Sequence, residues 1–126
     1  MSKFHNEKYF DVIILGAGLS GLTLANEISY RKNLNILIIE KKKKFIYDKN
    51  WCFWNIPNNP LTKKFDNCWK KIHIKIDKEE ITLNDNHISY LHIKSSTFYK
   101  EILKKINKKR VKILMNMNVN SISLTD

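Results

Sequence analysis

The sequence predicts an α/β fold organised around one βαβ unit, and three observations support this prediction. The apolar run Val12–Leu15 shows no polar alternation, as is typical of a parallel strand buried on both faces. The pattern G-x-G-x-x-G follows at once, at residues 16–21, and an amphipathic helical pattern continues from it. A second apolar run, Ile36–Ile39, ends in the carboxylate of Glu40. This order of elements is typical of a Rossmann-like dinucleotide-binding unit.

The glycine turn, residues 16–21, contains all three glycines of the chain. Gly16 allows a sharp turn out of the strand, where a side chain would be strained. Gly18 lets the backbone approach a pyrophosphate, and Gly21 lets the helix pack closely on the sheet. The free N–H groups and the positive dipole end of the helix attract an anion. We therefore predict a dinucleotide site; a tight turn that binds nothing is the alternative.

Glu40 stands at the tip of the second strand, where a carboxylate accepts hydrogen bonds from an adenosine ribose. The same charge would repel a 2′-phosphate, so Glu40 favours FAD or NAD over NADP. The four lysines at residues 41–44 favour the opposite choice, but they follow the strand end and are expected to point to solvent.

Further elements are expected after the βαβ unit. Residues 41–60 are predicted to be rich in loops. Isoleucines alternate with polar residues at 72–76, which predicts a half-buried strand that turns at 77–79 into a second strand, an inserted β-hairpin. A helix is expected to start with Ser95 or Ser96 as its cap.

Three strands complete the prediction. The apolar run Val111–Leu114 is expected to be the third parallel strand, beside the first. Short strands are also expected at residues 88–93 and 118–124. The expected parallel sheet of three strands has unpaired edges and one poorly covered face, so we predict an incomplete domain of marginal stability.

Length and charge limit the classes of protein to which the chain can belong. A chain of 126 residues is at most one domain, and its formal charge of +11 indicates nucleic acid or an anionic membrane as partners. Lys, Asn and Ile dominate throughout, however, as is typical of AT-rich codon usage. The densest late basic segment, residues 104–110, carries Ile106 and is expected to be the solvated face of a helix. We predict no nucleic-acid partner and keep a peripheral membrane surface as an open alternative.

The cysteines and the polar start of the chain indicate a cytoplasmic protein. Cys52 and Cys68 have neither a metal-binding spacing nor a C-x-x-C arrangement, so reduced thiols and no metal site are expected. Residues 1–8 are polar and do not resemble a signal peptide, and no apolar stretch is long enough to span a membrane. Contact with a membrane, if present, would be peripheral.

The sequence resembles the N-terminal part of the FAD-dependent lycopene cyclases, the carotenoid β-cyclase family. The resemblance rests on the GAGLSGL turn, the Ile-Ile-Glu strand end and the segment Asp48-x-x-Trp51-Cys52-Phe53-Trp54, together with the helix at residues 98–103. The glycine turn is common to many flavoproteins, whereas the aromatic segment is far more specific. This chain carries Lys49 and Asn50 where the family has arginine and threonine, and a lysine cannot fork two hydrogen bonds as a guanidinium can.

The resemblance implies a glutathione-reductase-type FAD fold. The residues that it implies for cofactor binding are Gly16, Ala17, Gly18, Leu19, Ser20 and Gly21 at the pyrophosphate, and Glu40 at the adenosine ribose. The implied reaction is the isomerisation of the ψ ends of lycopene into β rings. An acid protonates the end-group double bond, the carbocation closes the ring and a proton is lost; the flavin must be in its reduced state, although no net electrons pass to the product. NAD(P)H is a candidate reductant. The family's acidic motif and its flavin-side Gly-Asp segment would lie beyond Asp126.

The expected extent of the protein follows from this resemblance. Residues 1–126 correspond to the N-terminal part of a FAD-binding domain, roughly the first third of a family member. Such a fragment is expected to be inactive alone, and its expected partners are a lipophilic carotene and the remainder of the polypeptide or a split subunit. One alternative is a fragment of another flavoprotein of this fold, a prenyl-lipid reductase or a FAD-dependent hydroxylase. The other is a non-enzymatic basic module or a gene relic.

No catalytic residue is assigned within the chain. His73 and His92 have no acid or nucleophile placed near them by spacing, and the acids at residues 77–80 are expected in a solvated turn. Trp51, Phe53 and Trp54 could line a polyene tunnel or stabilise a carbocation through their ring faces. We favour the simpler interpretation, in which the three rings pack the loop against the sheet.

Overall fold

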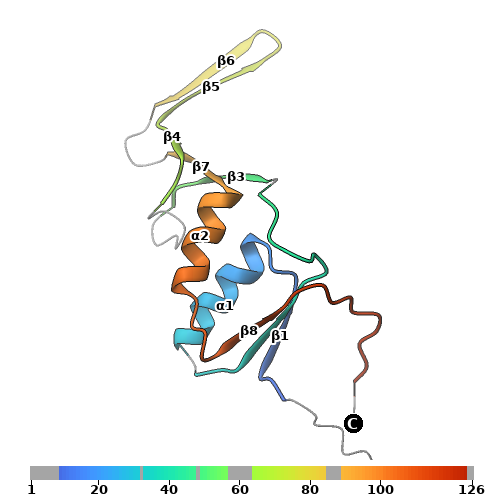
Figure 1. The fold of residues 1–126 in the computed structure, drawn as a ribbon. Helices are drawn as coiled ribbons and strands as arrows, with labels where there is room; N and C mark the ends of the chain where they lie inside the picture. The colour runs from blue at the N-terminus through green and yellow to red at the C-terminus, as the bar shows by residue number, and fades with distance from the viewer. Residues whose placement is uncertain (1–8, 32, 48, 57–63, 85–88, 125–126) are drawn as a thin grey trace, which may run out of the picture. The chain divides into compact units, whose positions relative to one another are not determined.

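The computed structural model describes residues 9–31, 33–47, 49–56, 64–84 and 89–124, and its fold is mixed α/β (Figure 1). Its elements are β1 (Val12–Leu15), α1 (Leu19–Arg31), β2 (Ile36–Ile39), β3 (Asn50–Trp54), β4 (Asn67–Trp69), β5 (Lys71–Ile76), β6 (Glu79–Asn84), β7 (Tyr90–Lys94), α2 (Ser95–Lys105) and β8 (Val111–Leu114). The chain divides into two compact units. The first comprises Met1–Phe45 with Ile102–Asp126, and the second comprises Ile46–Glu101.

The first unit contains a parallel sheet in which β2 is the central strand. The strand order is β1-β2-β8, with Ile36 opposite Val12 on one side and opposite Val111 on the other. The prediction that the third parallel strand lies beside the first is therefore wrong. The burial explains this order, because Ile36, Leu37 and Ile38 are all buried and a fully buried strand needs a hydrogen-bonded neighbour at each edge.

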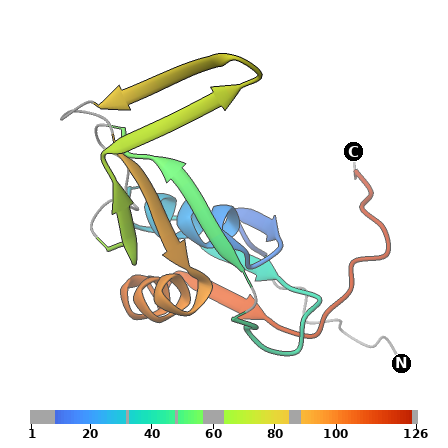
Figure 2. The ribbon, with the colours of Figure 1, turned by 90° about the horizontal axis from the view of Figure 1, so that it is seen from above.

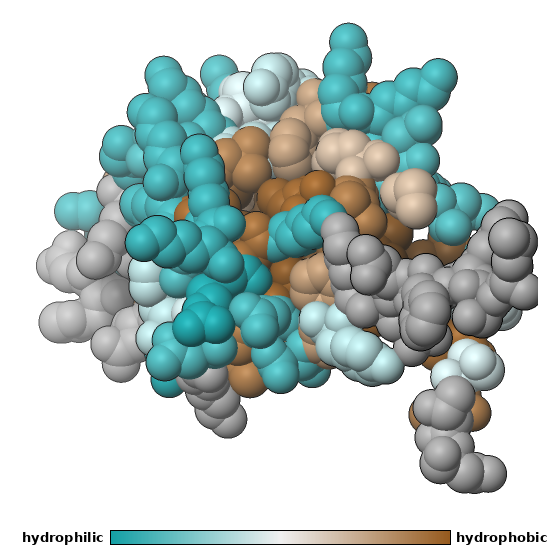
Figure 3. Space-filling view, turned by 60° about the horizontal axis from the view of Figure 1, so that its bottom comes forward, coloured by the Kyte–Doolittle hydropathy of each residue, from teal (hydrophilic) through white to brown (hydrophobic). Residues whose placement is uncertain are grey.

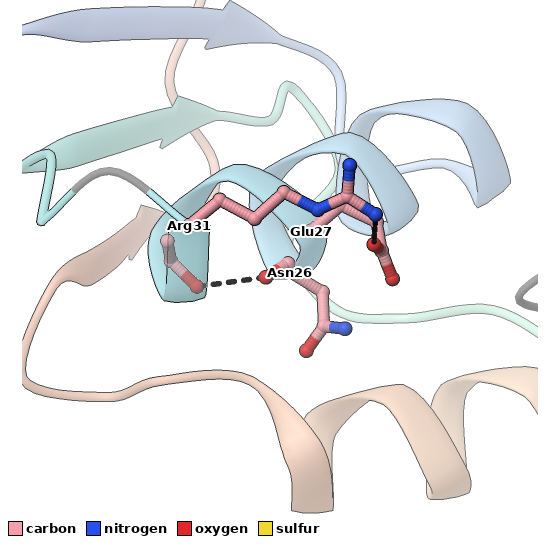
Figure 4. Close-up of polar contacts among 4 residues, drawn as sticks. Asn26, Glu27 and Arg31 are labelled. Atoms are coloured by element: carbon pink, nitrogen blue, oxygen red, sulfur yellow. Dashed lines mark hydrogen bonds and ion pairs between the residues drawn. The ribbon is translucent and has the colours of Figure 1, made fainter.

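Helix α1 covers one face of this sheet. Its buried residues Leu22, Ala25 and Ser29 recur at helical spacing, as the amphipathic pattern predicted. The buried Ser29 hydroxyl donates to the carbonyl oxygen of Asn26 at 2.9 Å, so its burial leaves no donor unsatisfied (Figure 4). Near the C-terminal end of the helix, the Arg31 guanidinium pairs with Glu27 at 3.1 Å (Figure 4).

The first strand is less buried than its apolar sequence predicted. Ile13 and Leu15 are 56% and 53% exposed, whereas Ile14 points to the α1 side, where its Cγ2 atom lies close to Gly21. Alternate residues of a strand point to opposite faces, so Ile13 and Leu15 lie on the face opposite α1. Hydrophobic side chains also reach the surface in the view of Figure 3. The expectation of one poorly covered sheet face is confirmed for β1.

The second unit contains an antiparallel sheet of order β3-β7-β4 (Figure 2). Residues 41–60 were predicted to be loop, and this is wrong for β3, whose burial alternates residue by residue. Trp51 points to the side of α2, where its ring meets that of Phe98 edge-on, with centroids 5.4 Å apart. Leu91 and Ile93 of β7 are buried in the same core. Trp51 therefore has a packing role, as predicted, but it packs from a strand against α2 and not from a loop against the sheet.

Strands β5 and β6 form the predicted β-hairpin. Ile76 pairs with Glu79, so the connecting loop has two residues, and Asp77 has a left-handed φ of 53°. The predicted half-burial is wrong, because Ile72 is the one residue of the two strands that is not exposed. The register explains the isoleucine alternation all the same, since it places every apolar side chain of the hairpin on one face.

The late part of the chain differs from the prediction in three places. Ser95 begins α2, but its hydroxyl accepts a bond from the Lys49 N–H at 3.2 Å. The helix ends at Lys105 and residues 108–110 form a turn, so residues 104–110 are not one helix face. The strand expected at residues 118–124 does not form. Over the described residues, neither helix has the length and apolar character needed to cross a membrane.

Candidate functional site

The glycine turn leaves β1 with the backbone conformation that glycine favours. Gly16 has a φ of 100°, and its N–H donates to the carbonyl oxygen of Ile39 at 2.8 Å. This bond fixes the turn beside the C-terminal end of β2. The predicted role of Gly16 in the sharp turn is confirmed by this geometry.

Gly21 is required by the packing of α1 on the turn. A Cβ atom at this position would lie 2.2 Å from the Gly16 carbonyl oxygen and 3.2 Å from the Cγ2 atom of Ile14. The first distance is far below van der Waals contact, and the atom that it meets is backbone. Any other residue here would push the helix away from the strand.

The packing that requires glycine at position 21 does not apply to Gly18. Its φ lies outside the left-handed region, and a Cβ atom built on it would meet none of the described residues within 4 Å. Neither the backbone nor the packing of this chain therefore calls for glycine at this position. Open space directly in front of a backbone at the start of a helix is what a closely approaching anion needs.

Glu40 lies against the glycine turn. Its Oε2 atom accepts a hydrogen bond from the Ala17 N–H at 2.7 Å, and its Oε1 atom accepts one from the Lys42 N–H at 2.9 Å. Burial raises the pKa of Glu40, but the bonds from Lys42 and Ala17 and the charges of Lys42 and Lys41 outweigh it and lower the pKa below its ordinary value. The carboxylate is therefore ionised at neutral pH.

The structure thus brings all seven predicted site residues together. The first α-helical bond runs from the Leu22 N–H to the Gly18 carbonyl oxygen. The N–H groups of Leu19, Ser20 and Gly21 precede this bond, at the positive end of the helix. A carboxylate and several backbone donors therefore lie close together at the start of α1.

The segment after β8 also borders this site, which the sequence did not predict. The Met117 N–H donates to the Glu40 carbonyl oxygen at 3.0 Å, and the Asn116 N–H donates to that of Lys42 at 2.9 Å. Asn116 has a φ of 57°, and asparagine tolerates this left-handed conformation well. The asparagines among residues 115–118 are the sequence signal that could have indicated a turn in this segment.

The other residues singled out in the sequence lie elsewhere. Asp48 is outside the described residues. His92 is held between two amides, with Nδ1 3.0 Å from the Asn67 Nδ2 atom and Nε2 3.1 Å from the Asn50 Oδ1 atom. His73 contacts Thr82 and Glu80 on the exposed hairpin.

The two cysteines and the acidic side chains form no metal centre in the described part of the chain. Cys52 and Cys68 are free, exposed thiols. Among the residues that the structure describes, no three His, Cys, Asp or Glu side chains come together as metal ligands do.

Fold and site together define a mixed α/β protein with a candidate nucleotide-binding turn at the edge of a parallel sheet. The comparison with known protein families gives a more specific assignment. The sequence model of the family described as Lycopene cyclase protein matches residues 11–125, and the chain belongs to that family. A search among curated proteins finds no match to this sequence. Family membership supports a function related to carotenoid cyclisation, and the family is generally flavin-dependent.

Proposed function

We propose that residues 16–21 and Glu40 bind the adenosine diphosphate half of FAD, and that the parallel sheet with α1 is a Rossmann-like unit of the glutathione-reductase type. The observation that carries this proposal is Gly18, the one glycine of the turn that the fold itself does not require. The open space beside Gly18 would admit the pyrophosphate, and a side chain at this position would exclude the pyrophosphate.

The pyrophosphate would take the backbone donors at the start of α1. The Ala17 N–H already donates to Glu40, so the pyrophosphate would take the N–H groups that follow it, those of Gly18, Leu19 and Ser20. The positive end of the helix dipole adds to their attraction for an anion.

Glu40 would hold the ribose without giving up its present bonds. Each of its two oxygens accepts one backbone N–H, and a carboxylate oxygen has a second lone pair for a further donor. Ribose hydroxyls can supply those donors. A 2′-phosphate would bring a second anion against an ionised carboxylate, so FAD is favoured over NADP.

The proposed role of the protein is that of a carotenoid cyclase component. When bound and reduced, the flavin supports the acid-catalysed isomerisation of lycopene ends that the family resemblance implies. We propose no catalytic acid in this chain, and we infer that the chain needs the remainder of the polypeptide, or a separate subunit, to act. The proposal also includes a cytoplasmic location at a membrane surface, because the substrate class is lipophilic.

Titration calorimetry with ADP and FAD tests the nucleotide site. We expect both ligands to bind, NADP to bind more weakly, and Gly18→Ala to weaken ADP binding by tenfold or more, which is about 1.4 kcal/mol. Leu24→Ala is the matched control, because Leu24 is an exposed residue of α1 outside the turn. Equal ADP affinity in wild type and Gly18→Ala would refute the proposal.

A further inference from the structure

Three aromatic rings form a row across the exposed face of the antiparallel sheet. Trp54 of β3 and Trp69 of β4 both pair in register with Tyr90 of β7, so the three side chains lie on one face at one level. The ring centroids of Trp54 and Tyr90 are 4.9 Å apart, and those of Trp69 and Tyr90 are 6.4 Å apart. Trp51 points the opposite way, toward α2. The aromatic segment of the sequence therefore places side chains on both faces of the antiparallel sheet.

These rings line a cavity of about 370 Å³ together with Lys71 and Ile72. We call this cavity the aromatic pocket. Trp54 and Trp69 remain 44% and 45% exposed, so the core does not use these ring faces. Among the residues that the structure describes, no carboxylate lines the pocket. Its volume is near the lower end of the range for small-molecule sites, roughly 300–1,000 Å³.

The apolar face of the hairpin extends the aromatic pocket. Ile72 lines the pocket and pairs with Leu83, and Ile74 pairs with Ile81 on the same face. Four of the five apolar side chains on this face are exposed: Ile74, Ile76, Ile81 and Leu83. From Ile72 to Ile76 the strip is roughly 13 Å long. A ligand that fits both parts would be elongated and apolar.

We propose that the aromatic pocket binds one end of an uncharged linear polyene, whose chain then follows the apolar face of β5 and β6. The π faces of three rings suit a conjugated chain, and the described part of the lining offers no acid to pair with a cationic ligand. The choice of a polyene, rather than another apolar ligand, rests on the proposed function in carotenoid cyclisation.

Lys71 indicates that the aromatic pocket holds the chain and does not cyclise it. Lys71 lines the pocket, and a positive charge near it would repel a carbocation, which opposes ring closure there. Single-stranded nucleic acid, which also stacks on aromatic rings, fits less well. Such sites have a groove of cations along the phosphates, whereas Lys71 is the only described residue with a positive charge in the lining of this pocket.

All-trans-retinol is a suitable neutral polyene probe, because its own fluorescence reports binding to the full 126-residue chain. We expect saturable binding, with Trp69→Ser weakening it on the order of tenfold and Trp69→Phe by less than about threefold. The matched control is Phe65→Ser, since Phe65 is 44% exposed in the same unit but does not line the pocket. Circular dichroism verifies folding, and Trp54→Ser replaces Trp69→Ser if that variant unfolds.

Several results would overturn the proposal. These are no saturable retinol binding, equal loss in Phe65→Ser, displacement of retinol by octadecanol as efficient as by a linear polyene, or displacement by a single-stranded oligonucleotide. Gly18→Ala separates this proposal from the nucleotide site, because it should weaken ADP binding and leave retinol binding unchanged. Retinol binding without ADP binding would uphold the aromatic pocket and refute the FAD proposal.

Discussion

At the scale of single residues, the addition of a methyl group should have different effects at Gly21 and at Gly18. At Gly21 it would lie 2.2 Å from the Gly16 carbonyl oxygen, so Gly21→Ala should lower the free energy of unfolding by about 1–3 kcal/mol. At Gly18 it would meet nothing within 4 Å, and Gly18→Ala should change that free energy by less than about 0.5 kcal/mol. Urea denaturation measures both. Equal stability of the two variants would contradict the described packing of α1.

Glu40 should make the stability depend on pH. Its folded-state pKa is below the ordinary value of 4.5, so its stabilising effect is fully present above that pH and is lost as the pH falls through the folded-state pKa. Glu40→Gln should therefore be less stable than wild type at pH 7, and the difference should shrink toward pH 3. Thermal unfolding across this range measures the effect. A difference that does not change with pH would show that the two backbone bonds of Glu40 do not favour its ionised form.

At the scale of elements, the order of the parallel sheet predicts unequal costs of truncation. Ile38 of the central strand is completely buried, so Ile38→Ala should cost about 2–5 kcal/mol. Ile13 of β1 is 56% exposed, so Ile13→Ala should cost less than about 1 kcal/mol. Chemical denaturation of the two variants measures this contrast. Equal costs would mean that β1 is as deeply buried as β2.

The βαβ unit could be predicted from the sequence because its signals are local. The apolar runs and the glycine spacing each act within a few residues. The position of β8 could not be predicted, since two edges were open to it and the choice depends on long-range pairing. Strand β3 was missed although Trp51 and Phe53 alternate with exposed residues, because the flanking loop signals outweighed that pattern.

In the candidate site, too, the local features could be predicted from the sequence and the long-range contacts could not. The spacing of Glu40 from the glycine turn predicted that they meet, and the Ala17 bond at 2.7 Å bears this out. The contribution of Asn116 and Met117 depends on the end of β8 lying next to β2. The aromatic row likewise depends on two strand registers, which place Trp54 and Trp69 on either side of Tyr90. Residues brought together across strands leave no mark in the local pattern.

At the scale of the whole molecule, the two candidate sites belong to different units. The glycine turn and Glu40 lie in the first unit, whereas the aromatic pocket lies in the second. In sequence, the second unit occupies the connection between the parallel strands β2 and β8. A crossover that is normally a single helix therefore carries a sheet and a hairpin of its own here. This arrangement would allow the cofactor and the polyene to be bound by separate elements.

The most direct test of the FAD proposal uses the fact that all three glycines of the chain lie in the turn. Protein labelled with ¹⁵N-glycine should give three amide resonances, which Gly18→Ala and Gly21→Ala assign. Titration with ADP to about 5 mM should shift the Gly18 resonance most, and FMN should leave all three unchanged. If ADP leaves the Gly18 resonance in place, or if FMN moves it as far, the adenosine end of FAD does not bind at this turn.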